Sequence, residues 1–229
     1  MTRMQILRPE WELSKLDDGL QFFEKLGKEI CPEFVIDENN RDVISRLIWY
    51  FHGSEKFTLI AGVKGDLQKG LLLMGKPGTG KTMIMQIFSK YVMHDDMFFQ
   101  VEGKHCKLSF PVTSVINVIS NYEETGNEFM EHYIKRRIIC FDDLGEEKKE
   151  AYHYGSRMNV MQEIIERRYH QNVITLATTN HSVDELGKMY GGRVHSRIYE
   201  MFNLIHLPGP DRRQGTVKFN EHAENQSNY

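Results

Sequence analysis

Short apolar runs alternate with amphipathic stretches along most of the chain. Five runs of mainly apolar residues occur beyond about residue 59, at 70–74, 97–101, 138–141, 173–177 and 203–207. Runs that are apolar throughout and separated by helical stretches are typical of parallel strands buried on both faces. The pattern therefore predicts a doubly wound α/β fold with a five-stranded parallel sheet flanked by helices. In such folds, ligands bind beyond the carboxyl ends of the strands.

Two amphipathic helices are expected before the first of these strands. The first covers about residues 11–30 and ends at Cys31-Pro32, because proline disfavours a helical residue before it. The second runs from about Asp37 to residue 51 and ends at Gly53. We divide the chain into a short helical N-terminal segment (1–33), an α/β domain (34–210) and a polar C-terminal tail (211–229). The apolar face of the first helix has two alternative uses, packing on the domain or docking on a partner protein.

Composition narrows the class of protein and its partners. The chain has 229 residues, of which 40% are hydrophobic and 27% charged, as in soluble globular proteins. Its formal net charge is -3, so a nucleic acid would have to meet a local basic patch. Three scattered cysteines without C-x-x-C spacing argue against a disulfide framework or a zinc site. No apolar run is long enough to cross a membrane and no signal peptide is evident, so we expect a cytoplasmic protein.

The motif that follows the first strand carries the strongest chemical signal. It matches G-x-x-x-x-G-K-[ST], in which glycines let successive backbone N–H groups converge on phosphate oxygens. Lysine supplies a cation to the β- and γ-phosphates, threonine binds Mg²⁺, and the following helix adds its positive dipole end. We therefore expect ATP and Mg²⁺ as ligands. The expected nucleotide-binding residues are Gly75, Lys76, Pro77, Gly78, Thr79, Gly80, Lys81, Thr82 and Met83.

Polar side chains follow two later strands. Asp142 and Asp143 end the third run, where the first carboxylate would hold Mg²⁺ together with Thr82 and the second would polarise the attacking water. Asn180 ends the fourth run and would orient water and contact the γ-phosphate. The alternative interpretations are a helix-capping acid pair and an ordinary turn asparagine.

The order of these elements resembles that of AAA+ ATPases, over about residues 34–213. Phe141-Asp-Asp-Leu-Gly145, the helix at 161–169, Ala177-Thr-Thr-Asn180 and Tyr190–Arg197 are similar to the DnaC/DnaI/IstB group. That group comprises helicase loaders and transposition helper ATPases and lacks the C-terminal helical lid of most AAA+ proteins. Most AAA+ proteins carry glutamate at the position of Asp143. The lid arginine of the family has no clear counterpart, and Arg212 and Arg213 are the candidates.

The resemblance implies an arginine finger before the fifth strand. Arg197 is the first candidate and Arg193 the second, and they lie one helical turn apart, so both could face one neighbouring subunit. An arginine supplied in trans to the γ-phosphate makes hydrolysis depend on assembly, so a homo-oligomer bridged by ATP is expected. The alternative interpretation is a surface salt bridge.

Basic residues at several positions could contribute to a DNA-facing surface, although a mixed-charge solvated face is the commoner explanation. They are Lys104, Lys107, Lys135, Arg136, Arg137, Arg167 and Arg168. The sequence and its resemblance favour an ATP-hydrolysing helicase loader that assembles on single-stranded DNA with a replicative helicase. The alternatives are a transposition helper binding duplex DNA and a transposase, a small-molecule kinase, and a nucleotide switch without turnover.

Overall fold

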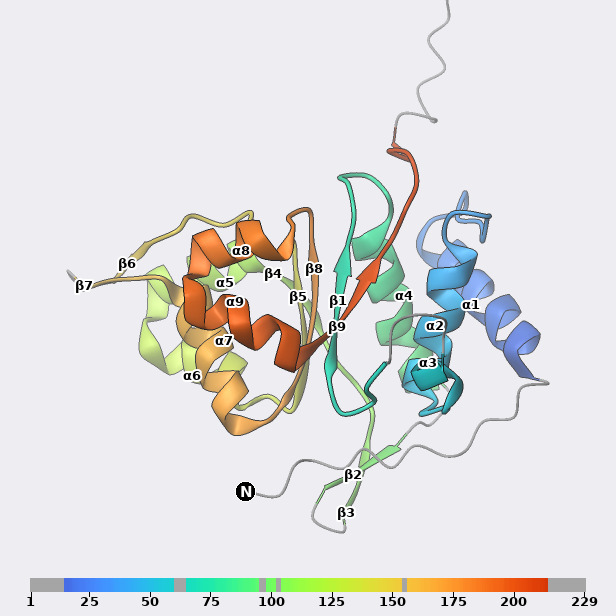
Figure 1. The fold of residues 1–229 in the computed structure, drawn as a ribbon, viewed down its shortest axis with the longest axis horizontal. Coiled ribbons are helices and arrows are strands. Elements are labelled where there is room, and N and C mark those ends of the chain that lie inside the picture. Colours follow the sequence, from blue (N-terminus) through green and yellow to red (C-terminus); the bar gives the residue numbers. More distant parts are fainter. Residues whose placement is uncertain (1–14, 60–64, 95–97, 102–103, 154–155, 214–229) are drawn as a thin grey trace, which may run out of the picture.

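A parallel five-stranded sheet organises the molecule (Figure 1). The computed structural model describes residues 15–59, 65–94, 98–101, 104–153 and 156–213. The strands lie in the order β4-β5-β8-β1-β9 and each neighbouring pair is parallel. Their bounds are β4 Val112–Ser114, β5 Ile138–Asp142, β8 Ile174–Thr179, β1 Gly70–Met74 and β9 Phe202–His206. The predicted fold class, with its five parallel strands, is confirmed.

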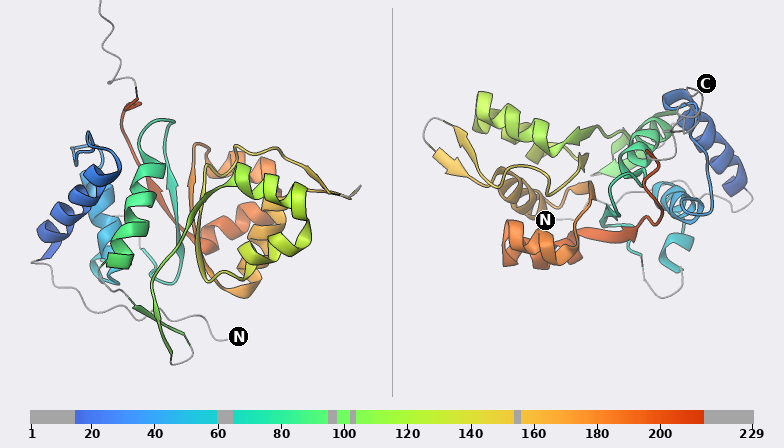
Figure 2. Two further views of the ribbon diagram at one scale, coloured as in Figure 1. Left: turned by 180° about the vertical axis from the view of Figure 1, so that it is seen from behind. Right: turned by 90° about the horizontal axis from the view of Figure 1, so that it is seen from above.

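One of the five predicted strands was assigned wrongly to the sheet. β2 (Phe98–Val101) is a strand, but it pairs antiparallel with β3 (Lys104–Lys107) in a separate ribbon; Met97 lies outside the described residues. Figures 1 and 2 show this ribbon beyond one end of the main sheet. The edge position belongs instead to β4, whose three residues are Val, Thr and Ser and only partly buried. An edge strand tolerates polar residues, so β4 shows no apolar run.

Helices cover both faces of the sheet. One face carries α1 (Leu16–Ile30), α2 (Arg41–Phe51), α3 (Lys56–Leu59) and α4 (Lys81–His94). The other carries α5 (Val115–Thr125), α6 (Asn127–Lys135), α7 (Val160–Gln171), α8 (Val183–Tyr190) and α9 (Gly192–Met201). Because side chains alternate along a strand, Leu71 and Leu73 of β1 enter the first core whereas Leu72 enters the second. The two layers are seen from behind and from above in Figure 2.

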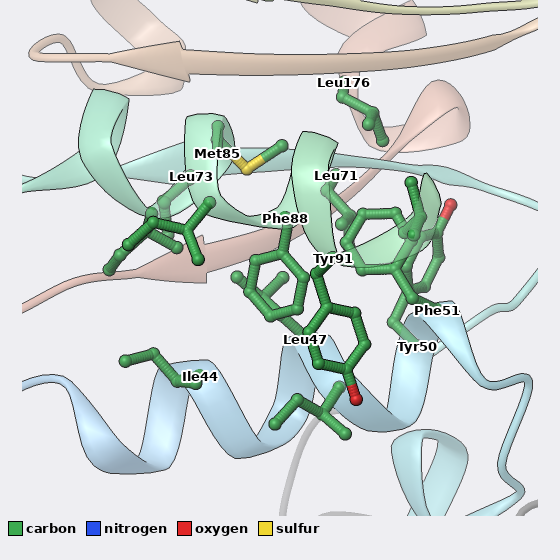
Figure 3. Packing of buried hydrophobic residues seen from close by; sticks show 14 of the residues in the cluster. Ile44, Leu47, Tyr50, Phe51, Leu71, Leu73, Met85, Phe88, Tyr91 and Leu176 are labelled. Atoms are coloured by element: carbon green, nitrogen blue, oxygen red, sulfur yellow. The ribbon is translucent and has the colours of Figure 1, made fainter. Parts of the chain in front are cut away.

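The first core joins α1 and α2 to the phosphate-loop helix. Figure 3 shows Phe88 and Tyr91 of α4 packed beside Leu47 of α2 and Leu71 of β1. Phe23 of α1 is fully buried, with its ring centroid 4.5 Å from that of Phe88. The apolar face of α1 is therefore used inside the chain. Residues 11–14 of the predicted helix lie outside the described residues.

Arg168, which we considered for a DNA-facing surface, is instead fully buried. Its guanidinium donates to backbone carbonyls at the end of α6 and the start of β8, and to Thr175 Oγ1 at 2.9 Å. Those carbonyls belong to Tyr133, Ile134, Arg136 and Ile174. Burial lowers its pKa to about 9. The side chain ties α6 to β8 and is not available for DNA.

The remaining elements are peripheral to the sheet. A hairpin of β6 (Ala151–His153) and β7 (Ser156–Met158) leads from β5 to α7. The described residues that follow β9, 207–213, form no helix. In the part of the chain that the structure describes, no helix has the length and apolar character needed to span a membrane.

Candidate nucleotide-binding site

The glycine-rich loop joins the carboxyl end of β1 to the amino end of α4. Gly78 and Gly80 have φ of 80° and 100°, in the left-handed region that favours glycine. A Cβ atom on Gly78 would also lie 1.8 Å from Asp211 Oδ1. Thr79 Oγ1 closes the loop by donating to Lys76 O at 2.9 Å. The left-handed glycines and this bond give the loop a tight turn at the amino end of α4, where the helix dipole favours an anion.

A cavity of about 760 Å³ opens beside this loop. This volume is typical of a site for a small organic ligand. The phosphate loop and the start of α4 form one side of it, and the segment between α1 and α2 forms another. Asp143, Asn180, Arg212 and Arg213 complete the lining. The cavity thus has the predicted phosphate-binding residues at one end and Phe34 and Val35, available to an apolar ring, elsewhere in its wall.

Lys81 is nearly buried and makes three polar contacts. Its Nζ donates to Gly75 O at 2.8 Å, to Lys76 O at 2.9 Å and to Asn180 Oδ1 at 2.6 Å. Burial lowers the pKa of Lys81, and the charges of Asp143 and Asp142 oppose that shift. An acceptor of stronger charge, such as a phosphate, would compete for these N–H groups.

The two predicted acids occupy different environments. Asp142 is 8% exposed, and its Oδ1 accepts a bond of 2.7 Å from Thr178 Oγ1. Asp143 lines the cavity, has φ of 58°, and donates from its backbone N to the same Thr178 hydroxyl at 2.9 Å. Burial, and then the charge of Asp142, raise the pKa of the Asp143 carboxyl. Thr178, which the sequence analysis did not single out, holds the acid pair in place.

The donor set fits Mg²⁺. Two adjacent carboxylates, one with a pKa raised partly by the other's charge, form a site that a divalent cation would neutralise. Thr82 lines the same cavity and offers a hydroxyl oxygen. Asp142 is 8% exposed and is not among the described residues that line the cavity.

Asn180 connects the phosphate loop to the loop after β5. Its Oδ1 accepts from Lys81, and its Nδ2 donates to Glu146 Oε1 at 2.8 Å. His181 Nε2 lies 3.4 Å from the same Glu146 oxygen. Glu146 carries no signal in the sequence, because four more charged residues follow it and no motif distinguishes it from them.

Asp37 and Arg212 form a clasp in the wall of the cavity. Arg212 makes a bidentate pair with Asp37, with Nη2–Oδ1 of 2.9 Å and Nη1–Oδ2 of 2.8 Å. Its Nε donates to Thr79 O and its backbone N to Gly78 O. The Arg212 hydrogen bond is the main cause that lowers the pKa of Asp37. This clasp joins the segment before α2, the phosphate loop and the segment after β9.

The two candidate finger arginines lie on α9, which is on the opposite side of the sheet from α4 (Figure 1). Arg197 Nη1 lies 2.9 Å from Glu166 Oε2, and its guanidinium lies 4.8 Å from the centre of the Tyr169 ring. Arg193 is exposed. Neither is among the described residues that line the cavity. The fold thus brings Lys81, Asp143 and Asn180 together at one cavity but not the two arginines.

Comparison with known proteins places this site in a family. The family model described as "ATPase family associated with various cellular activities (AAA)" matches residues 71–201. A search of curated proteins finds no match.

Solved structures share the fold at low sequence identity. The DnaC helicase loader is 20% identical with a TM-score of 0.52, covering 78% of this chain and 96% of that one. DnaI is 19% identical with a TM-score of 0.54, covering 91% and 97%. A putative primosome component from Streptococcus pyogenes serotype M3 is 19% identical with a TM-score of 0.53, covering 79% and 85%. With the phosphate loop, the acid pair and the sheet order in place, the family match identifies this chain as a member of the AAA family of ATPases.

Proposed function

We propose that this chain is an ATP-hydrolysing, helicase loader-like protein that acts in DNA replication. The observation that carries the proposal is the bond from Lys81 to Asn180, because it places the loop cation, the Asn180 amide and Asp143 around one cavity. The fold supports the loader class, since it matches DnaC and DnaI over nearly their whole chains. Such a role places the protein in the cytoplasm.

The residues around the cavity suit phosphoryl transfer to water. Lys81 would stabilise charge on the β- and γ-phosphates, and the Asp143 carboxylate would accept a hydrogen bond from the attacking water. Asn180 would orient that water or a γ-phosphate oxygen. Mg²⁺, when bound near Thr82 and Asp142, would neutralise charge on the phosphates.

Phosphate release by the purified protein tests the enzymatic part. We expect Lys81→Ala to lower the rate of ATP hydrolysis by about a hundredfold or more while the circular dichroism spectrum is unchanged. Lys90→Ala, which removes an exposed lysine from the same helix, is the matched control and should keep full activity. Turnover retained by Lys81→Ala would refute ATP hydrolysis at this loop.

Assembly would complete the site. We propose that Arg197 of a neighbouring copy reaches the γ-phosphate, so that ATP bridges subunits of a homo-oligomer. The support is the place of Arg197 on α9, away from its own cavity, where Tyr169 and Glu166 hold it half-buried. Breaking the Glu166 pair would release the guanidinium for this contact.

Single-stranded DNA and a replicative helicase are the proposed partners. DNA contacts would be local, because the net charge of the chain is -3. Two of the candidate basic residues, Lys135 and Arg167, form ion pairs with Glu131, so their charges are partly neutralised. Fluorescence anisotropy with labelled single- and double-stranded oligonucleotides, with ATP or ADP and at two salt concentrations, tests this. We expect binding to single strands that is promoted by ATP and weakened steeply by salt. Preference for duplex would favour a transposition helper, and no binding at low salt would favour a protein-only switch.

A further inference from the structure

Glu146 lies on the loop after β5, three residues beyond Asp143, and its side chain contacts the site at Asn180. Its backbone N donates to Asp143 O at 3.0 Å, which fixes the loop as a tight turn. Its Oε1 accepts the 2.8 Å bond from Asn180 Nδ2. Glu146 itself does not line the cavity among the residues described there. It therefore acts on the cavity through its bond to Asn180, which does line it, and through its charge, which acts to raise the pKa of both Lys81 and Asp143.

The chemistry of this contact is directional. An asparagine side chain has one end that accepts hydrogen bonds and one that donates them, and the two ends are similar in shape. A carboxylate accepts only, so Glu146 requires the NH₂ end of Asn180 to face it. Lys81 donates only, so it requires the oxygen end. Both partners of Asn180 therefore select the same orientation of the amide.

This orientation leaves one N–H of Asn180 for another acceptor. The amide nitrogen carries two hydrogens, and the bond to Glu146 uses one of them. Asn180 lines the cavity beside Lys81 and Asp143, so a phosphate oxygen or a water there could accept the second. The reversed amide would instead turn an oxygen towards the phosphate and repel it.

We propose that Glu146 is a positioning residue for the ATPase reaction, which holds the Asn180 amide so that its NH₂ group serves the γ-phosphate. His181 Nε2 lies 3.4 Å from the same carboxylate oxygen. The inference rests on the proposed ATPase function. It adds a residue that the phosphate-loop motif and the Asp142-Asp143 pair do not include.

The kinetic test compares two substitutions of Glu146. We expect Glu146→Ala to lower kcat by about five- to tenfold, the scale of one lost orienting hydrogen bond, with ATP affinity changed less than about twofold. Glu146→Gln keeps an acceptor oxygen and should retain activity within about threefold of wild type. In an Asn180→Ala background, Glu146→Ala should lower kcat no further. Glu124→Ala, which removes an exposed carboxylate from α5, is the matched control and should leave kcat unchanged.

An NMR measurement tests the orientation without activity. In protein labelled with ¹⁵N-asparagine, the two Asn180 side-chain amide protons should be well separated in shift, and Glu146→Ala should bring them together whereas Glu124→Ala should not. The proposal is overturned if Glu146→Ala leaves kcat and the amide shifts unchanged, if Glu146→Gln loses as much activity as Glu146→Ala, or if the loss persists without Asn180. Absence of turnover in wild type would refute the proposed ATPase instead, and the NMR result would still decide the orientation.

Discussion

Lys81 Nζ lies 2.6 Å from Asn180 Oδ1, although the two residues are 99 positions apart in the sequence. The contact follows from sheet topology, because β1 and β8 are neighbours and Met74 pairs in register with Thr179. Lys81 starts the helix that follows β1, and Asn180 comes directly after β8. The site thus assembles where the carboxyl ends of two parallel strands meet.

The adjacent acids should divide binding and chemistry between them. We expect Asp142→Asn to weaken Mg²⁺-dependent nucleotide binding by about tenfold or more, because it removes the carboxylate charge next to the cation site. Asp143→Asn should keep the affinity and lower kcat by about a hundredfold, because the group that polarises water is lost. Titration with a fluorescent nucleotide, with and without chelator, and phosphate release separate the two effects. Equal loss of binding in both variants would contradict this division.

Hydrolysis should depend on contact between subunits. We expect turnover per subunit to rise with protein concentration, and Arg197→Ala to lower kcat by about a thousandfold if it acts as the finger. Mixing Arg197→Ala with Lys81→Ala chains should recover part of the activity. The first variant keeps an intact phosphate loop and the second keeps the arginine finger, so a mixed interface can contain both. Arg193→Ala is the comparison variant on the same helix, and it should lower kcat less than Arg197→Ala does. Turnover independent of concentration, with no recovery on mixing, would rule out the shared site.

The clasp between Asp37 and Arg212 should make stability depend on pH. The pKa of Asp37 is lower in the folded protein than the usual 3.8, so its stabilisation is present above that value and is lost as the pH falls through the folded pKa. Because the pair is about a third exposed, Asp37→Asn should reduce the free energy of unfolding by at most about 1 kcal/mol at pH 7.

Urea unfolding of wild type and Asp37→Asn at pH 7, 5 and 3 measures this effect. The difference in the free energy of unfolding between the two proteins should be similar at pH 7 and pH 5, and it should become smaller at pH 3. Glu38→Gln changes the exposed neighbouring residue and serves as the control. Its free energy of unfolding should equal that of wild type at all three pH values. A difference that widens towards pH 3 would show that the Asp37 charge does not stabilise the clasp.

Replacing the buried arginine should destabilise the fold without affecting the site directly. Arg168→Met leaves several buried carbonyls without their donor, so we expect a loss of about 3 kcal/mol or more in the free energy of unfolding. Arg167→Met, at the neighbouring and more exposed position, should cost about 1 kcal/mol or less. Denaturant unfolding compares the two. Equal stabilities would contradict a structural role for Arg168.

Four of the five strands of the sheet and the phosphate loop were predictable because their signals are local. Buried strands appear as apolar runs, and the loop needs glycines at fixed spacing. β4 gave no such signal, since an edge strand of three residues does not need to be apolar. Asp37 and Glu146 act through side-chain contacts with residues far along the chain. Neither periodicity nor a motif reports such contacts, so the clasp and the orientation of Asn180 required the structure.

The clasp has a consequence for the order in which the protein becomes functional during its synthesis. Asp37 and Arg212 are 175 positions apart, and Arg212 also bonds to the phosphate loop through Thr79 O and Gly78 O. In a growing chain β1 has to wait for its partners β8 and β9, and the cavity wall is incomplete until residue 212 has left the ribosome. Nascent chains should therefore retain a nucleotide only after nearly the whole of this sequence has been made.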